Sequence, residues 1–243
     1  MYEIKIVVPI TTELRLEEHT DAMSDATANV SAMTITTGPE SIEGSCDEAY
    51  AVPGTIKACI EAERQGADAI VIDCMGDPGV DAAREVVSIP VVGPSRTAMY
   101  VAASLGHNFG VITMLESALP LFDDMARLYG MHDRVACCRH IDIPVLELAD
   151  DAERLTKALL AESVLAVEED RADVLILGCT GMFGIAGALR EGLADRGITG
   201  VPVVDPTPMA VEFAKGLVKV GLTHSRKAYA PPREKVICGY ELA

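Results

Sequence analysis

Two cysteines occupy equivalent places in a repeated segment of this chain. The first copy reads Ala67-Asp-Ala-Ile-Val-Ile-Asp-Cys74-Met-Gly-Asp-Pro-Gly79, and the second reads Ala172-Asp-Val-Leu-Ile-Leu-Gly-Cys179-Thr-Gly-Met-Phe-Gly184. A single offset aligns the Ala-Asp pair, the apolar run, the cysteine and two glycines without a gap. Because a thiolate takes a proton and a thiol donates one, such a pair is suited to acid–base chemistry on the two faces of one carbon atom.

Each cysteine follows a short apolar run that is typical of a buried parallel strand. Ligands of open α/β sheets bind at the carboxyl ends of such strands, so each thiol should lie at a ligand-binding edge. The glycines that follow let a ligand approach the backbone, and a helix N-terminus beyond them would lower the thiol pKa. We expect Asp77 to be the N-cap and Pro78 the first residue of the first of these helices.

The other candidate residues point to core or surface positions. Cys59 lies within a helical segment and is expected in the core, and the adjacent Cys137 and Cys138 match neither a zinc nor a thioredoxin spacing. The five histidines show no metal-binding spacing, and the chain has neither a phosphate loop nor a Gly-x-Gly-x-x-Gly motif. These observations predict no metal and no cofactor.

Composition limits the classes of partner. The chain has 243 residues, 49% of them apolar, and a net charge of -17, which opposes binding to nucleic acid or to anionic membranes. No apolar run reaches the length of a membrane span, and the charged first strand does not resemble a signal peptide. Seven cysteines, an odd number without regular spacing, are unlike a secreted disulfide framework, so we expect a cytoplasmic protein with a small-molecule substrate.

Strands and helices alternate along the chain, which predicts an α/β fold of mainly parallel sheets flanked by helices. The strands are expected at 4–9, 30–37, 67–73, 90–93, 109–113, 134–141, 172–178 and 202–206. The helices are expected at 14–29, 49–65, from 77 onward, 97–105, 117–129, 155–167 and 207–220. The tail after residue 223 shows no periodic pattern and is expected to lie on the surface.

A second echo supports a duplication. Pro90-Val-Val-Gly-Pro94 and Pro202-Val-Val-Asp-Pro206 are separated by nearly the same offset as the cysteines, and a Thr-x-Met sequence follows each of them. Two pseudo-symmetric lobes are therefore predicted, with the active site in the cleft between them. The first lobe comprises residues 1–97 plus 208–243, and the second comprises residues 98–207.

Three segments of the chain resemble one known superfamily. They are Gly38-Pro-Glu-Ser-Ile-Glu43, Asp73-Cys-Met-Gly-Asp-Pro-Gly79 with the following Asp81 to Glu85, and Leu177-Gly-Cys-Thr-Gly-Met182. The chain is identified on these residues as a member of the aspartate/glutamate/hydantoin racemase superfamily, in the hydantoin and allantoin racemase branch. The resemblance implies two pseudo-symmetric lobes and a cofactor-independent racemisation by two cysteines, which here are Cys74 and Cys179.

The same motifs and strand ends indicate where a substrate should bind. The expected contacts are Pro9, Ile10, Ser41, Ile42, Met75, Gly76, Thr113, Thr180 and Gly181. Val8-Pro9-Ile10-Thr11 replaces the Asn-Pro-Asn-Thr usual in this branch, and Met75 replaces a phenylalanine. Gly181 follows Cys179-Thr180 where the amino-acid racemases have a histidine, which disfavours a free amino acid as substrate. The superfamily also implies a homo-oligomer.

Three functions remain open at this point. The first is racemisation or epimerisation of a hydantoin-like ring by Cys74 and Cys179. The second is the reaction of a related isomerase, decarboxylase or amino-acid racemase of the superfamily. The third is a module whose thiols hold a metal or form a redox pair. Sulfurs on opposite faces of one carbon would lie roughly 6–7 Å apart, whereas two zinc-bound thiolates would lie about 3.8 Å apart.

Overall fold

The computed structural model describes residues 1–12 and 16–238 of the chain. The chain forms two compact units. Unit 1 comprises Met1–Ile42, Cys46–Gly93 and Ala210–Ala243, and unit 2 comprises Glu43–Ser45 and Pro94–Met209. Among the residues described, none of the helices combines the length and the apolar character needed to cross a membrane.

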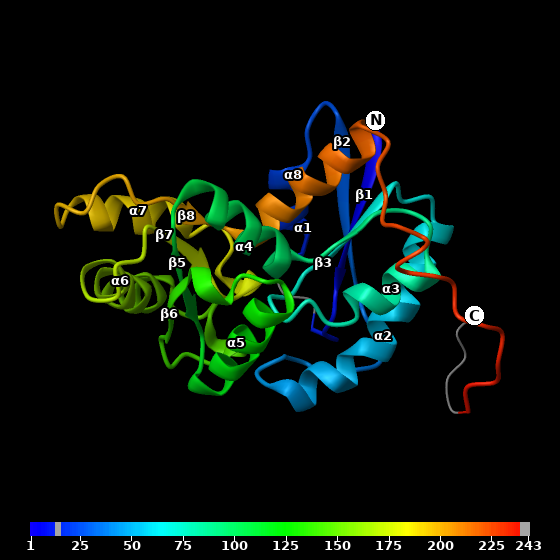
Figure 1. Ribbon diagram of the computed structural model, residues 1–243, viewed down its shortest axis with the longest axis horizontal. Helices are drawn as coiled ribbons and strands as arrows, with labels where there is room; N and C mark the ends of the chain where they lie inside the picture. Colours follow the sequence, from blue (N-terminus) through cyan, green and yellow to red (C-terminus); the bar gives the residue numbers. More distant parts are fainter. Residues whose placement is uncertain (13–15, 239–243) are drawn as a thin grey trace. The chain divides into compact units, whose positions relative to one another are not determined.

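Each unit contains a four-stranded parallel sheet (Figure 1). Unit 1 has the strand order β2-β1-β3-β4, and unit 2 has the order β6-β5-β7-β8. In chain order, the strands are β1 Tyr2–Val8, β2 Ala28–Thr34, β3 Ala69–Ile72, β4 Val91–Val92, β5 Phe109–Thr113, β6 Val135–His140, β7 Val174–Leu177 and β8 Val203–Val204. Because all pairs are parallel, the carboxyl ends of the strands in a unit meet at one edge of its sheet.

The strand register shows that the two units are structural copies. Ile4 of β1 pairs with Ala69 of β3, and Phe109 of β5 pairs with Val174 of β7, so the offset between the cysteines also relates these strands. In the next pair, Ile70 faces Val91 and Leu175 faces Val203. The residues that follow β4 and β8 are therefore equivalent, although they are further apart in sequence than the two cysteines. This confirms the predicted two-lobed α/β fold.

Helices cover both faces of each sheet. In chain order, they are α1 Leu16–Met23, α2 Ser45–Arg64, α3 Val80–Val86, α4 Pro94–Leu105, α5 Leu119–Leu128, α6 Ala152–Glu168, α7 Ala186–Ala194 and α8 Pro206–Lys219. In unit 1, α2 and α3 lie on one face, where their alanines and valines form an apolar cluster with the strands, and α1 and α8 lie on the other (Figure 1). The buried Lys215 of α8 bonds to the carbonyl of Met23 at the end of α1.

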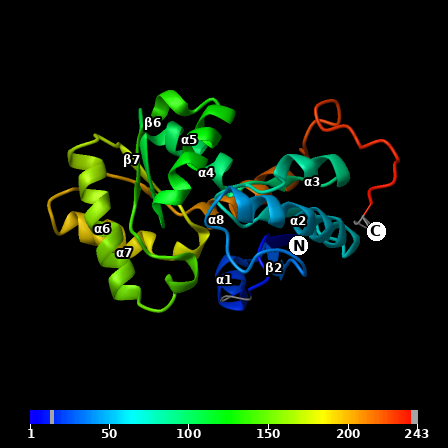
Figure 2. The ribbon, with the colours of Figure 1, turned by 90° about the horizontal axis from the view of Figure 1, so that it is seen from below.

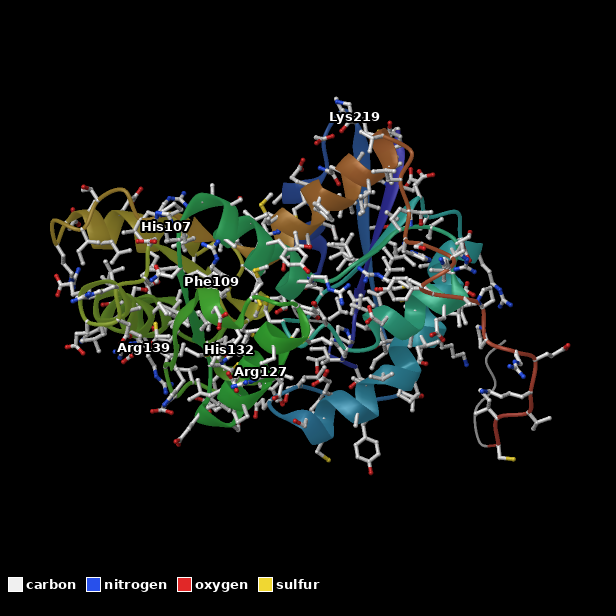
Figure 3. The ribbon with its side chains drawn as sticks, in the orientation of Figure 1. His107, Phe109, Arg127, His132, Arg139 and Lys219 are labelled. Atoms are coloured by element: carbon white, nitrogen blue, oxygen red, sulfur yellow. The ribbon has the colours of Figure 1, made fainter. Side chains whose placement is uncertain are left out.

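Unit 2 has the same layered arrangement. Helices α6 and α7 pack together on one face of the sheet, and α4 and α5 lie on the other (Figure 2). Phe109, the first residue of β5, is fully buried, and Arg139 of β6 is paired with Asp170 and Glu162 (Figure 3). Helix α4 follows β4 of unit 1 but packs on the sheet of unit 2. Helix α8 follows β8 of unit 2, and from Ala210 onward it belongs to unit 1.

Most strands lie close to their predicted positions, and β5 has the predicted bounds. The helix expected over 14–29 is too long: residues 14 and 15 lie outside the described part of the chain, and α1 ends at Met23. The carboxylate of Asp25 accepts the backbone N–H groups of Thr27 and Ala28, which forms a turn into β2. On the predicted face of α6, Val164 and Val167 are only half-buried, whereas Ser163 and Ala166 are fully buried.

The C-terminal segment lies against α3 without forming a helix or strand of its own up to residue 238. Arg226 donates hydrogen bonds to the carbonyl groups of Arg84 and Val87 at the end of α3. The hydroxyl of Tyr229 accepts a bond from Arg84, whose guanidinium also lies 5.2 Å from the centre of the tyrosine ring. The tail thus satisfies carbonyl groups that a helix C-terminus leaves without an intrahelical partner.

Candidate active site

Cys74 lies two residues beyond the end of β3 and is half-buried. Its sulfur accepts the backbone N–H of Gly76 at 3.4 Å, and its carbonyl accepts the N–H of Asp77 at 3.0 Å. Met75 and Gly76, both predicted substrate contacts, are buried in this turn. The turn therefore holds the sulfur beside a backbone donor, a contact that supports negative charge on it.

The surroundings of Cys74 in unit 1 are apolar. Cys74 and Ile10 pack against the cluster that contains Val7, Ile35 and Ile42. Pro9 is buried where β1 ends. The structure thus brings the predicted residues Ile10, Ile42 and Cys74 into one apolar cluster at the carboxyl edge of the first sheet.

Two loops at this edge are joined by hydrogen bonds. The backbone N–H and the hydroxyl of Thr11 bond to the carbonyl of Pro39, and the Thr12 hydroxyl bonds to the carbonyl of Glu40. Ser41, a further predicted contact, follows directly and is half-buried. The segments after β1 and β2 therefore form a connected rim at the carboxyl edge of the first sheet.

Cys179 lies two residues beyond the end of β7 and is more buried than Cys74, with 8% of its surface exposed. Before it, Gly178 donates its N–H to the carbonyl of Ile112 at 2.7 Å. A Cβ atom at position 178 would lie 2.8 Å from that carbonyl oxygen and 2.9 Å from the Cα of Thr113. Only glycine allows the ends of β5 and β7 to approach so closely.

The remaining predicted residues of unit 2 surround this turn. Thr113 is fully buried, and its hydroxyl bonds to the carbonyl of Gly178 at 3.3 Å. Thr180 is half-buried, whereas Gly181 is exposed, and a Cβ there would lie 3.5 Å from the Cys179 sulfur. Thr113 therefore supports the backbone beneath Cys179 with its hydroxyl.

The helix predicted to start at Asp77 and Pro78 begins later. Helix α3 starts at Val80, and its N-cap is Gly79 with φ +77°, so the predicted capping by Asp77 is wrong. Asp77 itself has φ +47°, a left-handed conformation, and its buried carboxyl group lies over Gly93. Its side chain thus contacts the end of β4 instead of capping a helix.

Two carboxyl groups near these turns have raised pKa values. Burial raises the pKa of Glu48, and the neighbouring charge of Asp77 adds to this effect. Burial also raises the pKa of Asp205 to about 6, although the backbone N–H groups of Gly184 and Thr207 counteract it. Such shifts are common at functional sites.

Sequence reasoning missed Asp205, Glu43 and the role of Asp77. The signal for Asp205 was present, because it is the residue that differs between the echoed segments Pro90–Pro94 and Pro202–Pro206. Glu43 lies in a loop without periodicity, yet its carboxylate accepts the N–H of Val145 at 2.7 Å and its carbonyl accepts the Ser117 hydroxyl. These bonds attach the short segment Glu43–Ser45 to unit 2.

The other cysteines and the metal-binding residue types form no comparable site. Cys59 is fully buried, as predicted, and burial raises its pKa. Burial likewise raises the pKa values of Cys137 and Cys138 to about 12. Over residues 1–12 and 16–238, no three His, Cys, Asp or Glu side chains are grouped so that they could hold a metal ion.

Comparisons with known proteins identify the family of this chain. The family model described as Asp/Glu/Hydantoin racemase matches residues 11–214. A hydantoin racemase of Rhizobium meliloti is 40% identical over 218 residues, which cover 89% of this chain and 88% of that protein. A hydantoin racemase of Pseudomonas sp. (strain NS671) is 36% identical and covers 98% of this chain and 94% of its own length. The chain therefore belongs to the Asp/Glu/hydantoin racemase family.

Solved structures agree with the family assignment. An allantoin racemase from Klebsiella pneumoniae has a TM-score of 0.91 at 32% identity and covers 98% of this chain and 97% of its own. Unliganded arylmalonate decarboxylase has a TM-score of 0.64 at 19% identity, with coverages of 90% and 93%, and shares the fold. The protein is accordingly an enzyme of the racemase type, as the resemblance implied.

Proposed function

We propose that this enzyme racemises a hydantoin-like ring, a 5-substituted cyclic ureide, by proton transfer between Cys74 and Cys179. One observation carries the proposal: the two cysteines follow the register-equivalent strands β3 and β7 of two duplicated units. A duplicated pair of thiols supplies one acid and one base of the same chemical type. That equivalence suits racemisation, because the two groups exchange roles when the other enantiomer reacts.

The proton transfers balance without a redox partner. In one direction, a thiolate at Cys74 takes the proton from the ring carbon, the C–H electron pair forms an enolate with the adjacent carbonyl, and the Cys179 thiol donates a proton to the opposite face. For the other enantiomer, Cys179 is the base and Cys74 the acid. The N–H of Gly76, which donates to the Cys74 sulfur, supports the anionic state of that thiol.

The hydantoin-like ring is proposed from the named relatives and the chemistry of its C–H bond. Three of the matched relatives are named hydantoin racemase, and two of the matched structures are described as allantoin racemases. The reacting carbon of such a ring is flanked by a carbonyl and a ring nitrogen, so its proton is acidic enough for a thiolate base. Backbone N–H groups in the cysteine turns are suited to stabilising the enolate oxygen without a metal.

The apolar residues at the end of β1 limit the ways in which the substrate can be held. Val8 and Ile10 lie where this branch usually has asparagines, and Ile10 packs on the cluster that also contacts Cys74. The apolar side chains at these positions offer no amide to hold the polar groups of the ring. We therefore propose that the ring is held chiefly by backbone groups and that Ile10 contacts its 5-substituent.

The test is deuterium exchange at the stereocentre. Enantiopure 5-substituted hydantoins, allantoin, aspartate and glutamate are each incubated with the enzyme in deuterated water, after dialysis of the enzyme against a metal chelator. We expect deuterium to enter the stereocentre of a hydantoin or of allantoin, together with loss of optical rotation. The two amino acids should remain unlabelled.

Two outcomes would overturn the proposal. Labelling of aspartate or glutamate alone would make the enzyme an amino-acid racemase. Activity that disappears on chelation and returns only with added zinc would favour the metal-holding alternative. Mass spectrometry of the recovered substrate separates these outcomes from the expected one.

A further inference from the structure

The carboxyl group of Asp205 stands at the end of β8 and is held by an unusual set of contacts. Its Oδ2 atom accepts the backbone N–H of Gly184 at 2.8 Å. The backbone N–H of Thr207 also lies near enough to stabilise the carboxylate, but the Oδ1 atom is buried without a hydrogen bond of acceptable geometry from the described part of the chain. Since an unsatisfied buried oxygen is costly, a carboxyl group kept in this place needs a compensating contact or role.

The bond from Asp205 reaches the segment that carries Cys179. This segment, residues 179–185, is here called the Cys179 loop. Within it, the N–H of Met182 bonds to the carbonyl of Cys179, and the N–H of Phe183 bonds to that of Thr180. Gly184 lies at the far end of the loop with φ +82°, just before α7. The Asp205–Gly184 bond therefore links the loop to the end of the neighbouring strand.

Unit 1 makes a corresponding link, but there the carboxyl group belongs to the cysteine turn and not to the residue after the outer strand. By register, Gly93 after β4 is the equivalent of Asp205 after β8. A Cβ atom at Gly93 would lie 2.4 Å from the carboxyl carbon of Asp77, which belongs to the Cys74 turn. The carboxyl group of Asp77 thus fills the space where Asp205 carries its side chain in unit 2. In each unit, one carboxyl group lies between the cysteine turn and the end of the outer strand.

We propose that Asp205 is a positioning residue that fixes the Cys179 loop through the Gly184 N–H, and that Asp77 performs the same task for the Cys74 turn from the opposite side. The inference rests on the proposed function only in taking the two cysteines as the reacting groups. Asp205 itself takes no part in proton transfer at the substrate. Its contribution is to hold the loop so that the thiol of Cys179 keeps one orientation.

The electrostatics of Asp205 are consistent with a structural bond rather than an ion pair. Burial raises its pKa to about 6, and the backbone N–H groups of Gly184 and Thr207 lower it from a still higher value. Among the described residues, no charged side chain contributes to the shift in the pKa of Asp205. At neutral pH, the group is therefore an anion whose charge is offset by backbone donors.

The test compares Asp205→Ala with Asp205→Asn. In the alanine variant, the Gly184 N–H loses its acceptor, so we expect amide hydrogen exchange in the peptide spanning 179–186 to become about tenfold faster. Turnover should fall about tenfold while KM stays nearly constant, because an imprecisely held thiol still allows binding. The asparagine variant keeps an oxygen acceptor and should restore both properties. Asp195→Ala, an exposed carboxylate after α7, is the matched control.

The exchange measurement separates the positioning role from the proposed function. Faster exchange in the loop supports positioning even if no hydantoin or allantoin is turned over. Unchanged exchange in the alanine variant would overturn the inference, and so would an asparagine variant as impaired as the alanine one. If the alanine variant does not fold, the amide resonance of Gly184 in the wild-type protein gives the answer. We expect it to titrate with a midpoint well above the ordinary range of an aspartate, and its failure to titrate would contradict the bond.

A second experiment tests whether the Asp77 carboxyl group in unit 1 takes the place that the Asp205 carboxyl group has in unit 2. Gly93→Asp alone should lower the melting temperature, because the new carboxyl group meets that of Asp77. Asp77→Ala alone leaves the space above Gly93 empty and should also lower the melting temperature. The double variant moves the carboxyl group to the side on which unit 2 carries it and should be more stable than the two single losses predict. Additive losses would contradict the equivalence.

Discussion

At the scale of single residues, the site uses backbone groups more than charged side chains. The sulfur of Cys74 accepts an N–H from Gly76, and the carboxylate of Asp205 accepts one from Gly184. Backbone donors of this kind are fixed by the fold and need no reorganisation when charge develops. The cost appears at Asp205, whose second oxygen is buried without a partner among the described residues. That cost should be measurable as a dependence of stability on pH.

We expect Asp205→Asn to change how folding stability depends on pH. Because burial raises the folded-state pKa of Asp205 from 3.8 to about 6, the folded protein binds this proton more tightly than the unfolded chain does. The wild-type protein therefore loses stability as the pH rises between those values, by at most about 3 kcal/mol, and the asparagine variant does not. The free energy of unfolding of the variant relative to wild type should rise across this window.

Urea unfolding of both proteins at a series of pH values measures this difference, since shifts at other groups cancel in the comparison. Asp195→Asn, which changes an exposed carboxylate in the same unit, is the matched control. A flat difference for Asp205→Asn would show that its carboxyl group has an ordinary pKa in the folded state.

At the scale of elements, the close approach of β5 and β7 places Cys179. Gly178 lies against the carbonyl of Ile112, and the Thr113 hydroxyl bonds to the carbonyl of Gly178. The cysteine that follows is therefore held at the edge of the sheet by main-chain packing. Any side chain at 178 must push the two strand ends apart.

We predict opposite effects for two glycine substitutions in unit 2. Gly178→Ala should destabilise the protein by about 1–3 kcal/mol, since its Cβ would lie 2.8 Å from a backbone oxygen. Gly187→Ala should stabilise it by about 0.5–1 kcal/mol, because a Cβ there meets nothing within 4 Å and alanine favours the helix α7. Thermal unfolding of the two variants gives both values. Equal effects would mean that the packing at Gly178 is looser than the structure indicates.

The sequence allowed the central strands and both cysteine turns to be predicted, because apolar runs bounded by glycine are strong local signals. The strand over 109–113 was predicted to the residue. The sequence did not allow the start of α3 to be predicted. Asp77 and Pro78 are residue types typical of a helix start, but Asp77 adopts a left-handed conformation and α3 begins at Val80. The contact of Asp77 with Gly93 depends on the pairing of β3 with β4, which local sequence does not encode.

At the scale of the whole molecule, duplication accounts for the two equivalent thiols on which the proposed chemistry depends. Each unit has the same strand order, and the offset between the cysteines also relates β1 to β5 and β3 to β7. The units differ in how their cysteine turns are secured, with Asp77 in one and Asp205 in the other. The proposed mechanism places nearly equal demands on both, because in it each thiol serves as acid in one direction and as base in the other.

The most direct measurement follows racemisation and α-proton exchange in deuterated water for Cys74→Ser and Cys179→Ser, with the exposed Cys46→Ser as control. We predict that each active-site variant loses racemisation by about 10²–10⁴-fold, while the control keeps it. Each should still exchange the α-proton of only one enantiomer, and the two variants should differ in which one. Near-normal racemisation in either variant would contradict the two-thiol account.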